Sequence, residues 1–535
     1  MMFRKTILAT TLAAAISGCS VSPQVVSPDN VLSTVKSDLD RLDREQAVAD
    51  APVSLNEAIA RAVKFNREKK LKALESALAQ GQVDLVRYEM LPDLTASAGY
   101  AKRNNFAASA SVTFTDGQPN ALGPNPTYSV SQDKERSNGS VAFSWNILDF
   151  GLSYVRAHQQ ADRYLIAKER ERKVGHNITQ EVRAAYWRAV SAERLLQKIS
   201  PLIGDASRAL DNSRRVEQLR LRSPLEALFY QRELLDVQRS LQSLRQDLIN
   251  AKTELAALMG MKPGSEFELA DVSQPDFTVP ELSISLQEME EQALSQRPEL
   301  VETYYQKRIS AADTRAAMLS MLPGITLEAG AYRDNSDFLL NQDWTSVGAR
   351  ISWNLFDVFK VGAERDLAKT REALAEEQRL AASMAVLTQV HLSNIRFEQA
   401  RKSFELADQY FDVANRINAH TRNSAQTQRG SELDLIRESL NTLLAELRRD
   451  VAYANLQNSY GRVFVTMGMD LLPDDYKEAG LTNLTSAIEQ RFDRWKRGEL
   501  EQVKAATPVS AEADIENPSL TKSAEANQSS DSPLI

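Results

Sequence analysis

The chain contains the heptapeptide SWNILDF at residues 144–150 and a second version of it, SWNLFDV, at residues 352–358. The tripeptide MGM occurs at residues 259–261 and again at 467–469, so both pairs are separated by 208 residues. Because this spacing is constant, the stretch between the two motifs is repeated without net insertion or deletion. The sequence therefore predicts a fold built from two copies of one unit, and such a repeat constrains the architecture more than any single motif.

The repeat continues upstream with a different spacing. The dipeptide LP at 91–92 matches LP at 322–323, which is an offset of 231 residues. The difference of 23 residues falls between Gly99 and Trp145, in a segment that contains the turn-forming sequences GQP and GPNP. The first copy is therefore predicted to carry a longer loop, with its tip in solvent.

Each copy continues as a long helical pattern after its tryptophan. Apolar residues recur at alternating spacings of three and four, as in Phe397, Ala400, Phe404, Ala407, Phe411 and Ala414. This 3.5-residue period is typical of left-handed coiled-coil packing. We therefore predict helical hairpins over 151–259 and 359–467, each forming a rod about 100 Å long at 1.5 Å per residue.

Each predicted hairpin has one internal break. The breaks are RLRSP at 220–224 and TQRGS at 427–431, where Ser223 and Ser431 are candidate N-caps. Pro201 lies inside the first long helix and predicts a kink there.

Four shorter segments alternate between apolar and polar residues. In the clearest of them, Val347, Ala349 and Ile351 alternate with polar residues or glycine. Runs of about ten residues with one apolar face are typical of transmembrane barrel strands, although a half-buried strand of a soluble sheet shows the same pattern. Four strands are fewer than the ~8 of the smallest outer-membrane barrels, so copies of the chain would have to share one barrel. The strands are predicted at about 93–104, 139–148, 324–333 and 346–356.

The N-terminus has the organisation of a secretory signal. Arg4 and Lys5 precede an apolar run over 7–16, which is shorter than the ~20 residues that span a bilayer. The run ends in ISGC, which resembles the bacterial lipobox, and Cys19 is the only cysteine of the chain. We therefore predict a signal peptide over 1–18 and acylation of Cys19, palmitate included, and Ser20 in place of Asp favours transport to the outer membrane. An ordinary signal peptide with an unrelated cysteine is the alternative.

Composition excludes several function classes. The net charge is -8 with no strongly basic domain, which argues against nucleic acid as a partner. One cysteine and four scattered histidines do not form a disulfide framework or a metal site. No phosphate-binding loop, Ser/His/Asp arrangement or paired-carboxylate motif is recognisable. The sequence predicts neither an enzyme nor a cofactor, apart from the covalent lipid on Cys19.

Taken together, these features resemble the TolC-like outer membrane efflux proteins (outer membrane factors). The resemblance rests on the duplicated strand–strand–long-helical-hairpin units, on SLNEAI at 54–59, on LP before a strand and on WN followed by Asp149 or Asp357. It covers about 54–470, and the lipobox places the chain near the lipoprotein branch. It implies a mainly α fold with a small β part: a homotrimer whose twelve-stranded outer-membrane β-barrel continues as a periplasmic α-helical tunnel with an equatorial belt.

The resemblance also implies a division of the chain. Residues 19–53 form a lipidated N-terminal arm, and the belt is built from 54–66, 261–298 and 470–505. The full division is a first structural repeat over 54–269, a second over 270–470, a C-terminal equatorial segment over 471–505 and a disordered tail over 506–535.

The implied function is passive conduction of small toxic molecules, drugs or metal ions, from an inner-membrane pump to the outside. The implied partners are outer membrane lipid, a periplasmic adaptor (membrane fusion) protein and an inner-membrane transporter, of the RND type rather than the ABC type. One alternative is the duct of a type I protein or peptide secretion system. Another is a non-conducting, structural coiled-coil lipoprotein.

The resemblance places a gate at the periplasmic tip. Asp434 matches a first acidic ring, and Glu226 matches a residue that links the two hairpins. Arg437 replaces the acid expected at a second ring and could instead pair with Asp434, one helical turn away. The basic partner of that link matches Gly430, and the adjacent Arg429 is a candidate substitute. Adaptor docking is implied at the hairpin tips, and all four gate charges could equally be solvated surface residues. The docking residues are Arg222, Ser223, Gly430 and Ser431.

Overall fold

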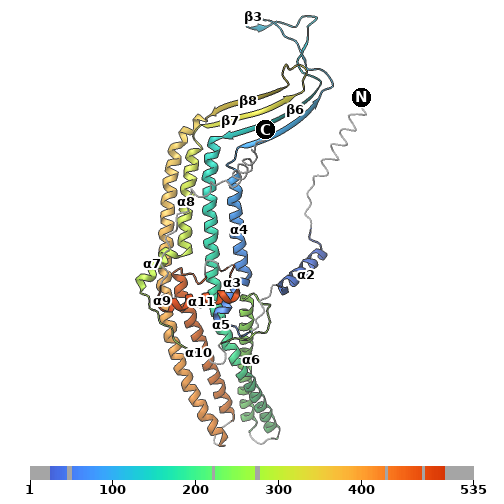
Figure 1. Cartoon of the computed structure of the whole chain (residues 1–535). Coiled ribbons are helices and arrows are strands. Elements are labelled where there is room, and N and C mark those ends of the chain that lie inside the picture. The colour runs from blue at the N-terminus through green and yellow to red at the C-terminus, as the bar shows by residue number, and fades with distance from the viewer. Residues whose placement is uncertain are drawn as a thin grey trace, which may run out of the picture.

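The computed structural model describes residues 25–44, 51–219, 223–270, 277–427, 432–472, 476 and 478–499. The molecule is a long rod with a curved β-sheet at one end, helical hairpins at the other and a belt of short helices between them (Figure 1). Several predictions lie outside the described residues: the signal peptide, the C-terminal tail, Cys19, Arg222, Arg429, Gly430 and Ser431.

Within the described residues, the sheet contains four long antiparallel strands in the order β1-β6-β7-β8. Its register places Leu94, Phe143, Ala329 and Val347 side by side in one row across the sheet. Since successive side chains alternate between faces, the aliphatic residues of this row and its neighbours share one face. The other face carries small and polar residues together with the stacked pair of Tyr332 and Trp344. The predicted alternation is therefore confirmed. The bounds are β1 Asp93–Lys102, β6 Glu135–Asn146, β7 Gly324–Asp334 and β8 Asp343–Ser352.

The strand ends correct the sequence prediction. β6 ends at Asn146, and its side chain accepts hydrogen bonds from the backbone N–H groups of Leu148 and Asp149. β8 ends at Ser352, and Asn354 accepts a hydrogen bond from the backbone N–H of Phe356. Because each asparagine caps a helical turn, the strands cannot continue to 148 and 356 as predicted. The repeated SWN motif is thus a strand-to-helix junction.

The insertion of the first copy forms two small hairpins beyond the far end of the sheet (Figure 1). Asp116 and Gly117 have φ values of 52° and 76° at the tip of one of them. Most of residues 103–134 are exposed, which agrees with the predicted solvent-facing loop. The hairpins pair β2 Ala108–Ser109 with β5 Ser129–Val130, and β3 Phe114–Thr115 with β4 Gln118–Pro119.

Six long helices of the described chain form the rod. The 72 residues of α5 correspond to about 108 Å of helix, and α5 contacts α4, α6, α8 and α10. Pro201 lies within α5 without ending it, so the kink predicted there stays a prediction. The bounds are α4 Arg67–Tyr88, α5 Ile147–Gln218, α6 Pro224–Leu258, α8 Pro298–Leu319, α9 Val361–Gln426 and α10 Glu432–Thr466. None of the helices in the described ranges is long and apolar enough to cross a bilayer.

The belt joins the two repeats. Its helices are α3 Leu55–Phe65, α7 Leu286–Gln296 and α11 Leu481–Lys496, and a parallel bridge pairs Val53 with Leu269. A large apolar cluster around Tyr186, Tyr460 and Phe464 fills this region. The α2 helix, Pro28–Arg44, lies beside the belt with every residue exposed (Figure 1).

The MGM repeats end α6 and α10. Gly260 and Gly468 have φ values of 74° and 75°, in the left-handed region that glycine adopts freely. The backbone N–H of Met261 donates to the carbonyl of Ala256, and that of Met469 donates to the carbonyl of Phe464. These are the six-to-one hydrogen bonds of Schellman caps, so the repeated glycines stop both helices at the belt.

Candidate functional site

The tip opposite the sheet brings four helix ends together: the C-termini of α5 and α9 and the N-termini of α6 and α10 (Figure 1). Ser223 is the N-cap residue of α6, as predicted, but its side chain makes no capping hydrogen bond. Pro224 follows it at the first helical position, where the missing N–H costs nothing.

A polar link crosses between the hairpins near this tip. Arg437 on α10 forms an ion pair with Glu233 on α6, and its Nη1 lies 3.7 Å from the Oδ1 of Asp434. The structure therefore brings Asp434 and Arg437 together, as their spacing of three suggested. Glu226 is exposed in the first turn of α6 and has no ion pair within the described part of the chain. The role of Glu233 was not predicted, because this residue lies on another helix and no local pattern in the sequence indicates its pairing with Arg437.

A second polar link lies deeper, between α5 and α10. Lys198 Nζ lies 2.6 Å from Glu446 Oε1, and Arg194 forms an ion pair with Asp450. Ser191 Oγ also donates to Asp450 Oδ2, at 3.1 Å. Glu446 and Asp450 are each only 5% exposed. A buried charge is tolerated when it is paired and hydrogen-bonded, so this cluster holds the first hairpin against the second.

The belt has its own partly buried charge network. Asp470 accepts hydrogen bonds from Arg172 Nε at 2.7 Å and lies 2.6 Å from His176 Nε2. Arg172 Nη2 donates to the carbonyls of Gln296 and Gly468. Burial alone raises the pKa of Asp470, but His176 and Arg172 outweigh it and lower the pKa to about 2. The network ties α5 to the ends of α7 and α10.

Asp470→Asn is expected to reduce the free energy of unfolding by about 1–2 kcal/mol at neutral pH, a figure lowered for solvent screening. The pKa of Asp470 is about 2 when folded against an ordinary 3.8, so its contribution is complete above pH 4 and disappears toward pH 2. Melting curves of wild type and variant between pH 7 and 2 measure this. Asp366→Asn, at an exposed residue of α9, is the control; an equal loss in both variants would contradict the assignment.

No group of His, Cys, Asp and Glu side chains in the described ranges is arranged to hold a metal ion.

A model of the outer membrane efflux protein family matches residues 66–261 and 290–462. The CmeC outer membrane channel of Campylobacter jejuni superimposes with a TM-score of 0.59 at 13% identity, over 90% of this chain and 99% of that one. The MtrE outer membrane channel of Neisseria gonorrhoeae, in its open state, superimposes with a TM-score of 0.56 at 17% identity, over 78% of this chain and 93% of that one. CusC superimposes with a TM-score of 0.58 at 15% identity, over 80% of this chain and 96% of that one. These structural likenesses establish the fold. In a separate comparison of sequences, no curated protein matches the chain.

Proposed function

The chain belongs to the outer membrane efflux protein family, and from this premise we propose that it forms the outer membrane channel of a tripartite efflux system. Members of this family are passive channels, so the chain is not an enzyme. The energy for transport must then come from a partner protein in the inner membrane.

The sheet supports a shared barrel. Its two outer strands, β1 and β8, each have one edge with no partner strand in the described chain. An unpaired edge is a template for another strand. Three copies joined β1 to β8 would close a twelve-stranded barrel, with the row of Leu94, Phe143, Ala329 and Val347 toward lipid and the polar face toward a water-filled bore. This pattern of one apolar and one polar face carries the proposal.

The tip and the N-terminus suggest the partners. We propose that a periplasmic adaptor docks where the hairpins end, at Arg222, Ser223, Gly430 and Ser431, and that the inner-membrane transporter is of the RND type. The proposed cargo is small toxic molecules, either drugs or metal ions. Acylation of Cys19 would anchor the arm to the outer membrane, since a lipobox-like end of the signal fits the efflux branch better than protein secretion.

One experiment tests the channel itself. The mature chain, purified in mild detergent, is expected to run as a trimer and to conduct ions after insertion into planar lipid bilayers. A monomer that leaves the bilayer sealed would refute the proposal, and a trimer that does not conduct would favour a structural lipoprotein. Mass spectrometry of the N-terminal peptide, with Cys19→Ala as control, tests the acylation separately.

The tip link is expected to hold the channel closed. Glu233→Ala removes the acid that binds Arg437, and Asp434→Ala with Arg429→Ala removes the predicted acidic ring and the candidate basic partner of Glu226. An exposed pair contributes about 1 kcal/mol at most, so each lost link shifts the ratio of closed to open tips by up to about five-fold. Single-channel recordings should show larger conductance or more frequent opening.

The matched control for these tip variants is Asp412→Ala, which removes an exposed pair with Arg416 inside α9 alone. Its conductance should equal that of wild type, because no second helix is released. Unchanged conductance in the Glu233 and Asp434 variants would remove these residues from the gate.

A further inference from the structure

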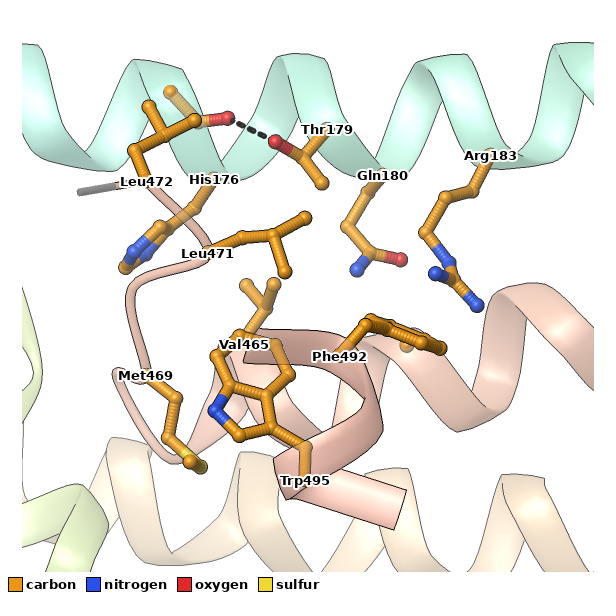
Figure 2. A pocket seen from close by; sticks show the side chains of 12 residues that line it. His176, Thr179, Gln180, Arg183, Val465, Met469, Leu471, Leu472, Phe492 and Trp495 are labelled. Carbon is orange, nitrogen blue, oxygen red and sulfur yellow. Dashed lines mark hydrogen bonds between the residues drawn. The ribbon is translucent and has the colours of Figure 1, made fainter. Parts of the chain in front are cut away.

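A small cavity lies in the belt between α5, the end of α10 and α11 (Figure 2). Its volume is about 10 Å³, which is room for one particle of about the size of a water molecule. Most of the wall is apolar, with side chains such as Val465, Leu471 and Phe492. Arg183, Gln180 and Trp495 contribute polar atoms to the same wall.

Arg183 is the unusual member of this wall. Its side chain is buried, with 1% of the residue exposed, and its Nη2 donates to the carbonyl of Gln457 at 3.2 Å. Its Nε and Nη1 have no hydrogen-bond acceptor in the part of the chain that the structure describes. The guanidinium carbon lies 4.4 Å from the ring centre of Phe492, which covers one face of the cation. Among the described residues that line the cavity there is no aspartate or glutamate.

The lack of a side chain at Gly461 leaves room for the guanidinium group of Arg183. A Cβ at Gly461 would lie 2.5 Å from Arg183 Nε, so any larger residue there would displace the guanidinium. Within the described ranges, Trp495 Nε1 is a further buried donor without an acceptor, and Gln180 Oε1 is a buried acceptor without a donor. Buried polar groups are almost always satisfied, so several open groups around one cavity indicate a missing ligand.

We propose that this cavity binds one monovalent anion of the size of chloride, held by the Nε–H and Nη1–H groups of Arg183. Water would satisfy these donors but would leave the buried positive charge without a counter-charge from the described lining residues, which is unfavourable in an apolar site. Sulfate and phosphate are too large for the cavity. A half-turn of the Gln180 amide would direct its NH₂ group toward the anion as another donor.

The anion would act as a structural link. It would neutralise a cation on α5 at the point where α10 and α11 meet that helix, and so stabilise the belt. This role is independent of conduction, because the cavity lies within one chain.

Crystals grown in sodium bromide test the site directly. The expected result is an anomalous bromide peak within hydrogen-bonding distance of both Arg183 Nε and Nη1. A cavity that holds only water, or that is empty of density, would overturn the proposal.

Melting temperatures provide a second test with variants. At equal ionic strength, chloride and bromide should raise the melting temperature of wild type by a few degrees over gluconate. Arg183→Met should abolish the halide effect, and Gly461→Ala should weaken it. Arg188→Met, on the same helix at an exposed pair with Glu254, should retain the full effect. An equal halide effect in Arg183→Met and Arg188→Met would refute the site. If Arg183→Met does not fold, wild type in halide against gluconate and the bromide map decide the question.

Discussion

The substitution Gly468→Ala is expected to lower the free energy of unfolding by about 3 kcal/mol or more. This is among the largest effects expected from adding a single methyl group to this chain. The residue has a φ of 75°, which costs a side-chain-bearing residue about 1–2 kcal/mol. In addition, the new Cβ would lie 2.6–2.8 Å from the backbone of Gln296 and Arg297. Backbone atoms cannot rotate away as a side chain does, so α10 would have to separate from the start of α8.

The two costs can be measured apart. Gly264 has a φ of 88° but no atom within 4 Å of its would-be Cβ, so Gly264→Ala carries the conformational cost alone. Gly260→Ala should resemble Gly468→Ala, because its Cβ would lie 2.7–2.9 Å from Phe65. Thermal melting and the yield of folded protein provide the comparison. Equal losses at Gly264 and Gly468 would show that the close approach has no energetic role.

The sequence predicted these glycines only as marks of a repeat. The matching spacing of MGM showed that something was required twice, and glycine before a break is a common helix stop. The contacts that make the glycines irreplaceable come from Phe65 in one copy and from Gln296 in the other, which are distant in sequence. The close approach of a neighbouring backbone to each glycine depends on how the helices pack, so no local sequence pattern predicts it.

The strands and long helices were predictable because their signals are periodic. The alternation around Val347 and the three-four spacing around Phe404 each continue for many residues, so a single exception does not change the reading. The ends were less predictable. A strand and a capped helix share the SWN motif, and the alternation of Trp353 and Leu355 continued past the true end of β8 at Ser352.

The candidate site was predictable only in part for a related reason. The spacing of Asp434 and Arg437 within one helix indicated their contact, whereas Glu233 lies on another helix, and its pairing with Arg437 depends on the rotation of α6. The link between Arg194 and Asp450 is similar, since it pairs residues 256 positions apart. Charged residues inside a coiled-coil pattern look like solvated positions until the second hairpin covers them.

That buried link leads to the second large prediction. Asp450→Ala would remove an acid that contacts Arg194, Arg449 and Ser191. Arg194 and Arg449 would remain largely buried with less counter-charge, and breaking a buried ion pair on one side costs about 3–5 kcal/mol. The hairpins should then separate below the belt, so the variant should melt earlier, expose α10 to protease and leak ions through the tip.

A double variant distinguishes lost pairing from lost packing. Asp450→Leu with Arg194→Met replaces both partners by apolar side chains, and such replacements are often neutral or stabilising. It should therefore recover most of the stability that Asp450→Ala loses. Glu254→Ala, which removes an exposed pair with Arg188 between α5 and α6, should change stability by about 1 kcal/mol at most. If Asp450→Ala were no more harmful than Glu254→Ala, the buried charges would not be what holds the two hairpins together. The apolar cluster that contains Leu195, Leu241 and Leu440 would then carry that role.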